Sequence, residues 1–155
     1  IGLEGELRYY PPAIRNLELS TGFGIFNTEI VENIADPTLE GNELQQIPKH
    51  VANIAASYAP ESGLGGSLKW RSLGSYYTNN QNTGEYEGYD VVNASLFYTV
   101  RGEGNQNTRW YLDINNLTNE VYAESVSGAD AQGQPTSFNP RPPINVMIGV
   151  IVSLM

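Results

Sequence analysis

The stretch WYLDINNLTNEVY, residues 110–122, decides how the whole chain is interpreted. Its first half alternates strictly, with Trp110, Leu112 and Ile114 on one face and more polar side chains on the other. A period of two residues predicts a β-strand that has one apolar and one polar face. We interpret the polar run at residues 115–119 as a continuation of this strand and not as a turn.

Length, charge and composition narrow the class of protein. The chain has 155 residues, which suits one domain, and it has no cysteine, which excludes disulfides and thiol chemistry. A formal net charge of -9 argues against nucleic acid as a partner, because no basic patch can neutralise phosphates. Charged residues make up 16%, below the roughly 25% of soluble domains. An apolar run of about 18 residues, which a transmembrane helix would need, is absent from the sequence.

Six further segments alternate in the same way, so the sequence predicts an all-β chain of seven strands. The connections are short after the first, third and fifth strands and long after the second, fourth and sixth. The predicted strands are residues 3–10, 16–28, 49–59, 66–78, 89–100, 110–122 and 144–155. The long loops are residues 29–48, 79–88 and 125–143, and two of the short turns are residues 60–63 and 102–107.

This sorting of connections by length favours a transmembrane barrel over a soluble sheet. Outer-membrane barrels have short periplasmic turns, long extracellular loops and aromatic belts at both membrane interfaces. The alternation alone would also fit a sheet with one solvated face. When the strands are followed alternately down and up, however, the aromatic residues gather at two levels. The short-turn end holds Tyr9, Tyr10, Tyr58, Trp70, Tyr98, Trp110 and Tyr111, and the long-loop end holds Phe26, Tyr76, Tyr77, Tyr89 and Tyr122.

Several motifs, in order along the chain, resemble those of TonB-dependent outer-membrane receptors. NLTNEVY at residues 116–122 is similar to the signature near the end of those receptors, and IGLEGEL at residues 1–7 is similar to one of their strands. Each motif alone is weakly specific, but together they keep the family's order and span essentially the whole chain. The further matches are GNEL and IPKH within residues 41–50, SYYTN at 75–79, GYDVVNA at 88–94 and PRP at 140–142.

The resemblance implies an antiparallel up-and-down meander that forms the last seven strands of a 22-stranded transmembrane β-barrel with a plugged lumen. Residues 1–155 are then expected to be the C-terminal part of a receptor, with the plug domain and earlier strands absent. The implied protein lies in the bacterial outer membrane and takes up a scarce ligand, most often an iron–siderophore complex, by TonB-coupled transport. Its expected partners are outer-membrane lipid, the plug domain and remaining barrel strands, TonB through the absent N-terminal part, and the small ligand.

Candidate ligand contacts lie at lumen-facing positions and in the long loops. The alternation puts Lys69 and Arg71 on the lumen side, where they would meet an anionic ferric siderophore or the plug. Pairing with acidic groups of neighbouring strands is the simpler expectation for both. The loops at residues 79–88 and 125–143 are expected to contact the ligand. The full set of ligand-binding candidates is Lys69, Arg71, Tyr77, Asn79, Tyr86 and Arg141.

Other chemistry is not indicated. His50 is expected to be a belt or loop residue, because the sequence has no second histidine or cysteine to complete a metal site. The loop carboxylates Asp36, Glu40 and Glu43 lack the spacing of a calcium loop and are expected to be solvated. Without a catalytic, metal or cofactor motif, the chain is predicted not to be an enzyme and to need no cofactor. A passive outer-membrane pore and a soluble all-β binding module stay open as other functions.

Overall fold

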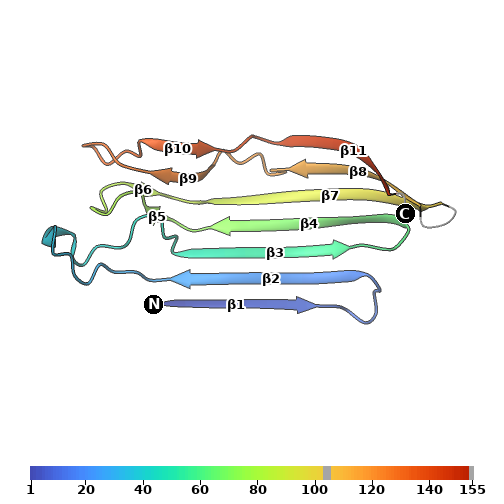
Figure 1. Cartoon of the computed structure of the whole chain (residues 1–155), viewed down its shortest axis with the longest axis horizontal. Coiled ribbons are helices and arrows are strands. Elements are labelled where there is room, and N and C mark those ends of the chain that lie inside the picture. The colour runs from blue at the N-terminus through green and yellow to red at the C-terminus, as the bar shows by residue number, and fades with distance from the viewer. Residues whose placement is uncertain (103–105, 154–155) are drawn as a thin grey trace.

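The main body of the chain is one antiparallel sheet of seven strands (Figure 1), as predicted. The computed structural model describes residues 1–102 and 106–153. Strands that follow one another along the chain also pair with one another, apart from the insertions at the long loops. The spatial order is β1 (Gly2–Tyr9), β2 (Leu17–Phe26), β3 (His50–Tyr58), β4 (Gly63–Leu73), β7 (Tyr89–Arg101), β8 (Asn107–Asn115) and β11 (Asn145–Ser153).

Continuous registers give the sheet two chemically distinct faces. Ile54 of β3 is opposite Trp70 of β4, which is opposite Val92 of β7, and the same alternation holds across the other strands. We call this side the apolar face, and its exposed side chains include Leu3, Leu7, Ile25, Leu68, Leu96, Trp110, Ile148 and Val150. The other side, the polar face, carries Glu4, Glu6, Lys69, Arg71, Arg109 and Asp113.

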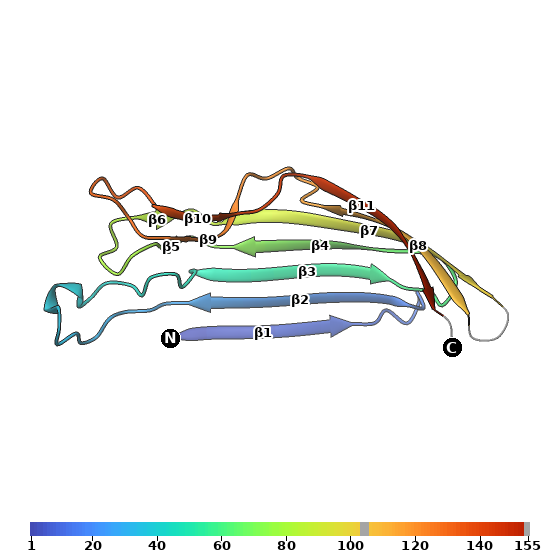
Figure 2. The same cartoon turned by 45° about the horizontal axis from the view of Figure 1, so that its top comes forward.

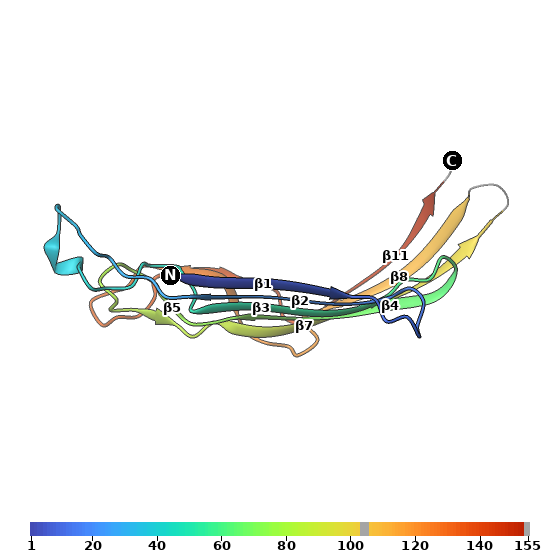
Figure 3. The ribbon, with the colours of Figure 1, turned by 90° about the horizontal axis from the view of Figure 1, so that it is seen from below.

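The sheet is a single layer, so the apolar face is left uncovered by the described residues (Figure 3). A continuous apolar surface of this kind is unusual on a soluble protein and matches the lipid-facing band of a membrane barrel. Tyr9, Tyr58, Tyr98 and Trp110 are exposed on this face toward the short-turn end, as a belt requires. The predicted belt fails at the long-loop end for Tyr76 and Tyr89, which are buried, and at the short-turn end for Tyr111, which lies on the polar face. The uncovered face argues against the soluble binding module.

The long connections carry structure of their own at one end of the sheet (Figure 2). A 3₁₀ turn, η1 (Pro37–Leu39), lies in the first of them. The predicted loop at residues 79–88 contains β6 (Glu85–Tyr86), which pairs with β5 (Tyr76–Tyr77). The predicted loop at residues 125–143 contains most of β9 (Ala123–Ser127), which pairs with β10 (Ser137–Pro140). Among the described residues, no helix is long and apolar enough to cross a membrane.

The prediction that one strand runs through residues 110–122 is wrong. β8 ends at Asn115, and the chain turns at Asn116, whose φ is 56°, and again at Asn119, whose φ is 53°. These values are left-handed, a region that an extended strand cannot contain and that asparagine tolerates better than most residues. The Asn116 N–H donates to Asn93 Oδ1 at 2.8 Å, which anchors the turn to β7.

Other strand boundaries also differ from the sequence prediction, most clearly those of β4 and the start of β8. The strand predicted at residues 66–78 instead runs over Gly63–Leu73, because Gly63 pairs with Thr99 and Tyr76–Tyr77 leaves the main sheet for its own hairpin. β8 begins at Asn107, within the predicted turn. Residues 103–105 of that turn, and Leu154 and Met155 of the predicted final strand, lie outside the described residues.

Candidate ligand-binding site at the long-loop end

Two arginines from distant parts of the sequence meet at one carboxylate. Arg71 extends from the polar face of β4, and its Nη1 lies 3.9 Å from Glu124 Oε1 in β9. Arg141 directly follows β10, and its Nη2 contacts the other oxygen, Oε2, of the same carboxylate. All three side chains stay partly exposed, at 49%, 32% and 47% for Arg71, Glu124 and Arg141. Because arginine is always charged, one carboxylate between two guanidinium groups leaves an excess positive charge that faces solvent.

A tyrosine hydroxyl without a partner lies beside this pair. Tyr89, at the start of β7, is 4% exposed, and among the described residues its hydroxyl has no hydrogen-bond partner. The Arg71 guanidinium lies over the Tyr89 ring, 5.5 Å from its centroid, and the Tyr122 ring lies 4.4 Å away. Buried hydroxyls are normally hydrogen-bonded, so the hydrogen-bonding capacity of this group is unused among the described residues.

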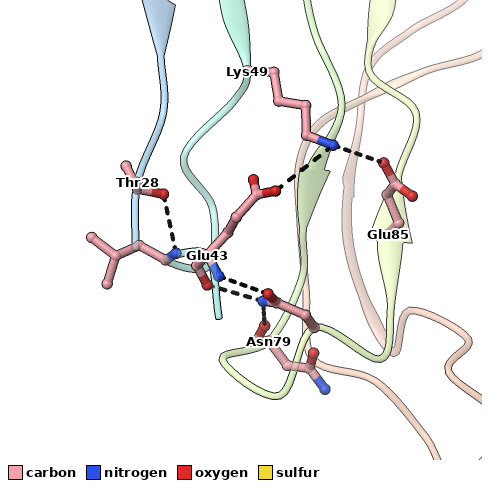
Figure 4. A network of polar contacts seen from close by, with 7 residues as sticks. Thr28, Glu43, Lys49, Asn79 and Glu85 are labelled. Carbon is pink, nitrogen blue, oxygen red and sulfur yellow. Dashed lines mark hydrogen bonds and ion pairs between the residues drawn. The ribbon is translucent and has the colours of Figure 1, made fainter. Parts of the chain in front are cut away.

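A second charged group joins the first two long connections (Figure 4). Lys49 Nζ lies 4.0 Å from Glu43 Oε1 and 3.8 Å from Glu85 Oε1. The same Nζ lies 5.5 Å from the centroid of the Tyr77 ring. These ion pairs are long and half-exposed, so each contributes at most about 1 kcal/mol.

Asparagine side chains add shorter, neutral bonds between the same connections (Figure 4). The Glu43 N–H donates to Asn82 Oδ1 at 2.7 Å, and Asn82 Nδ2 donates back to the Glu43 carbonyl at 2.9 Å. Asn82 Nδ2 also reaches the Asn79 carbonyl at 3.3 Å. The φ of Asn82 is 54°, a left-handed value that asparagine tolerates, and its side-chain amide forms the bonds described above.

The β5–β6 and β9–β10 hairpins are joined through buried tyrosines. Tyr76 packs with Ala123 and Val126 in the small core of this region, and Tyr86 packs edge-on against Tyr76 with centroids 5.4 Å apart. Burial raises the pKa of the Tyr76 and Tyr86 hydroxyls above the ordinary value. Both hydroxyls bond to the backbone of β9 and stay neutral.

The predicted ligand-binding residues are distributed over several environments. The structure brings Arg71 and Arg141 together on Glu124, which comes from β9 and not from a strand adjacent to β4. Lys69 lies on the polar face, in register with Ala55 and Asn93. The other three lie at the long-loop end, with Tyr77 beneath Lys49, Asn79 Nδ2 donating to Thr83 Oγ1 at 2.8 Å, and the Tyr86 hydroxyl bonded to Ala123.

Three residues of the site were missed by the sequence reasoning. Glu124 pairs with Arg71, and Lys49 pairs with Glu85, in each case across a long stretch of sequence, so local patterning holds no signal for these two contacts. For Tyr89, by contrast, the sequence does hold a signal. Strand alternation puts Tyr89 on the polar face together with Val91 and Asn93, so its position alone made it a candidate.

The remaining predicted residues have ordinary structural roles. His50 Nε2 lies 3.3 Å from Ser72 Oγ on the apolar face of the sheet. Asp36 caps η1 by accepting the Thr38 N–H at 3.2 Å, and Glu40 accepts the Asn33 N–H at the same distance. Within the part of the chain that the structure describes, no cluster of three or more histidine, cysteine or acidic side chains could hold a metal.

Comparison with known proteins agrees with the geometry. The sequence model of the family described as "TonB dependent receptor-like, beta-barrel" matches residues 2–117. Among curated proteins, the ferrichrome outer membrane transporter/phage receptor of Escherichia coli (strain K12) is 32% identical over 106 residues. This alignment covers 66% of the chain but 14% of that relative, so the chain spans a small part of the relative's length.

Solved receptor structures share the fold over nearly the whole chain. The ferric preacinetobactin receptor of Acinetobacter baumannii matches with a TM-score of 0.74 at 22% identity, over 96% of this chain and 21% of that one. The unliganded ferric citrate transporter matches with a TM-score of 0.75 at 20% identity, over 98% and 24%. At these identities the likeness concerns the fold alone.

Proposed function

This chain belongs to the family of TonB-dependent receptor-like β-barrels, and from that premise we propose that it is the C-terminal part of a receptor that imports an anionic iron chelate. Proteins of this family are receptors and transporters of the bacterial outer membrane and not enzymes. The coupling to TonB and the identity of the chelate belong to the proposal. Its support is the family membership together with the paired arginines on the polar face.

The open edges of the sheet support the proposed domain assignment. β1 and β11 each pair with a strand on one side and leave the other side without a partner among the described residues. In lipid, each unpaired backbone group costs roughly several kcal/mol of free energy, so a sheet that spans the membrane has to close on itself. We propose that further strands complete a 22-stranded barrel around a plug domain, as the family resemblance implies.

The Arg71–Glu124–Arg141 arrangement is the observation that carries the ligand proposal. The whole chain has a net charge of -9, yet this cluster presents an excess positive charge on the side that faces the lumen. A guanidinium group binds carboxylate, catecholate or other anionic oxygens through paired N–H donors.

The other candidates are proposed to contribute in different ways. Lys69 lies on the same strand and face as Arg71 and extends the positive surface into the lumen. Tyr77 and Asn79 lie at the outer rim, where an arriving chelate makes first contact. The Tyr86 hydroxyl is already bonded to Ala123, so Tyr86 acts through position and not through direct contact.

Binding measurements on the full-length receptor test this function. Arg71→Gln and Arg141→Gln are each compared with wild type for ferric citrate and a ferric tricatecholate, which are anionic, and for a ferric trihydroxamate, which is neutral. Each substitution is expected to raise Kd for an anionic chelate at least about tenfold, since a hydrogen bond to a charged group contributes about 1.5–3 kcal/mol. The neutral chelate is expected to change less.

The matched control is Arg101→Gln. Arg101 is also an exposed arginine, but its Nη2 pairs with Glu61 at 2.6 Å at the short-turn end of the sheet. Its substitution is expected to leave Kd unchanged. The proposal is rejected if the wild-type receptor binds no anionic chelate, or if Arg71→Gln and Arg141→Gln bind as tightly as Arg101→Gln.

A further inference from the structure

Two tyrosine hydroxyls bond to the backbone of β9 in the same unusual way. The Tyr76 hydroxyl accepts the Val126 N–H at 2.7 Å and donates to the Val126 carbonyl at 3.2 Å. The Tyr86 hydroxyl accepts the Ala123 N–H at 3.1 Å and donates to the Ala123 carbonyl at 2.8 Å. Each hydroxyl therefore satisfies both backbone groups of one residue, as a neighbouring strand would. β9 thus has β10 on one edge and two side chains on the other.

Burial and further hydrogen bonds strengthen this junction. Val126 is 1% exposed, Tyr76 4% and Ala123 6%, and Leu73 at the end of β4 packs against them. Next to them, the Gly128 N–H donates to the Thr78 carbonyl at 2.8 Å, and Thr78 Oγ1 donates to the Gly128 carbonyl at 2.7 Å. Buried bonds of this kind are costly to break singly, because each leaves an unsatisfied polar group.

The junction brackets the carboxylate of the candidate site. Glu124 lies between Ala123 and Val126, the two residues that the tyrosines hold. Arg141 is fixed to the same segment, since its N–H donates to the Tyr122 carbonyl at 3.0 Å. Arg71, by contrast, extends from the main sheet through β4. The distance between Arg71 and the other two charged groups is therefore set by how β9 lies against the β5–β6 hairpin.

We propose that Tyr76 and Tyr86 are positioning residues, whose hydroxyls join the β5–β6 and β9–β10 hairpins into one rigid unit and hold Glu124 and Arg141 opposite Arg71. This unit is a fixed part of the ligand site and not a lid that closes over it. The positioning role rests on the proposed function of the arginine pair. The rigidity of the unit is independent of any ligand, and it is tested separately.

Hydrogen exchange in the full-length receptor tests the rigidity. Tyr76→Phe and Tyr86→Phe remove the hydroxyl and keep the ring in the core. The Val126 amide in the first variant and the Ala123 amide in the second are expected to exchange at least about tenfold faster than in wild type. In either variant the amide of Gly128 is expected to exchange faster as well, because the two hairpins open together. Faster exchange that stays confined to the amide that lost its hydroxyl partner overturns the rigid unit.

Tyr77→Phe is the matched control. Tyr77 neighbours Tyr76 in β5, but its ring lies beneath Lys49 and not in the core. Its substitution is expected to leave all three amides unchanged. An equal effect of Tyr77→Phe would show that any loss of a hydroxyl at this end loosens the hairpins, which also overturns the assignment.

A double-mutant cycle tests the positioning role. Tyr86→Phe is expected to raise Kd for ferric citrate about fivefold. Glu124→Gln has an effect of its own, because it increases the positive charge of the cluster and removes the carboxylate between the two arginines. If the hydroxyl acts through Glu124, adding Tyr86→Phe to Glu124→Gln has little further effect. Fully additive losses would overturn the positioning role while leaving the arginine site intact. If Arg71→Gln binds normally, the proposed function has failed instead.

Discussion

Replacing Asn116 by alanine probes the turn that ends β8. Asn116 is 2% exposed, and its φ is 56°. Its Nδ2 donates to the Glu120 carbonyl at 2.8 Å and the Pro142 carbonyl at 3.2 Å, while its Oδ1 accepts the Glu120 N–H at 2.8 Å. Three hydrogen bonds at about 1 kcal/mol each, with about 1 kcal/mol for a left-handed alanine, give a loss of about 4 kcal/mol.

Hydrogen exchange at the Leu117 amide measures this loss. That N–H donates to the Val92 carbonyl at 2.7 Å and is not itself altered by the substitution. In the full-length receptor, Asn116→Ala is expected to speed its exchange by up to about a thousandfold. Asn116→Gly loses the same three bonds but tolerates the backbone angle, so its exchange is expected to be about fivefold slower than that of the alanine variant.

The control for this experiment is Thr118→Ala. Thr118 is exposed, and its Oγ1 lies 3.5 Å from Asn116 Oδ1, at the limit of a hydrogen bond. In Thr118→Ala, the Leu117 amide is expected to exchange at the wild-type rate. Equal exchange rates for Asn116→Ala and Asn116→Gly would refute the expected cost of the left-handed backbone angle. Rates within about threefold of wild type in both variants would refute the expected contribution of the three hydrogen bonds.

Three further predictions concern packing, pH and charge. Gly149→Ala is expected to lower the stability of the receptor by about 1–3 kcal/mol and to lower the yield of folded protein, because a Cβ there would overlap the Tyr111 ring. The control is Gly22→Ala, whose Cβ meets only a carbonyl at 3.9 Å, so this variant should fold normally. Burial raises the pKa of Tyr76 and Tyr86, so the junction is expected to be fully stable below about pH 10 and to weaken above it. Amide exchange in β9, corrected for the intrinsic effect of pH on exchange, should show this weakening. Tyr76→Phe should make the pH dependence smaller. Lys49→Met is expected to change the melting temperature by less than about 2 °C, because its ion pairs to Glu43 and Glu85 are long and half-exposed.

The fold was predictable because its signals are local and repeated. Alternation in each strand is a property of adjacent residues, and Ile54, Trp70 and Val92 fall on one face for the same reason that their own strands alternate. The length of the connections is also read directly from the sequence. The turn at Asn116 was missed because polar residues at a strand end fit both a solvated strand and a turn. The deciding signal was the left-handed preference of Asn116 and Asn119, which hydrophobic patterning does not register.

The candidate site was predictable only in part, because its geometry depends on contacts between distant segments. Arg71 was found by strand alternation and Arg141 by its place in a long loop. Glu124, which joins them, lies in a strand whose partners, β10 and the Tyr86 hydroxyl, come from other parts of the sequence. Tyr76 was assigned to an aromatic belt, since a buried hairpin tyrosine and an interfacial tyrosine look the same in sequence.

At the long-loop end, neutral groups and charged groups have different roles. The connections are held to one another mainly by amide and hydroxyl bonds, as at Asn82 with Glu43 and at Tyr76 with Val126. Exposed ion pairs would serve poorly there, because salt screens them over about 8–10 Å and each contributes at most about 1 kcal/mol. Neutral bonds keep their strength when ionic strength changes outside the cell. In the proposed function, the excess positive charge of the two arginines at Glu124 serves to bind the anionic chelate.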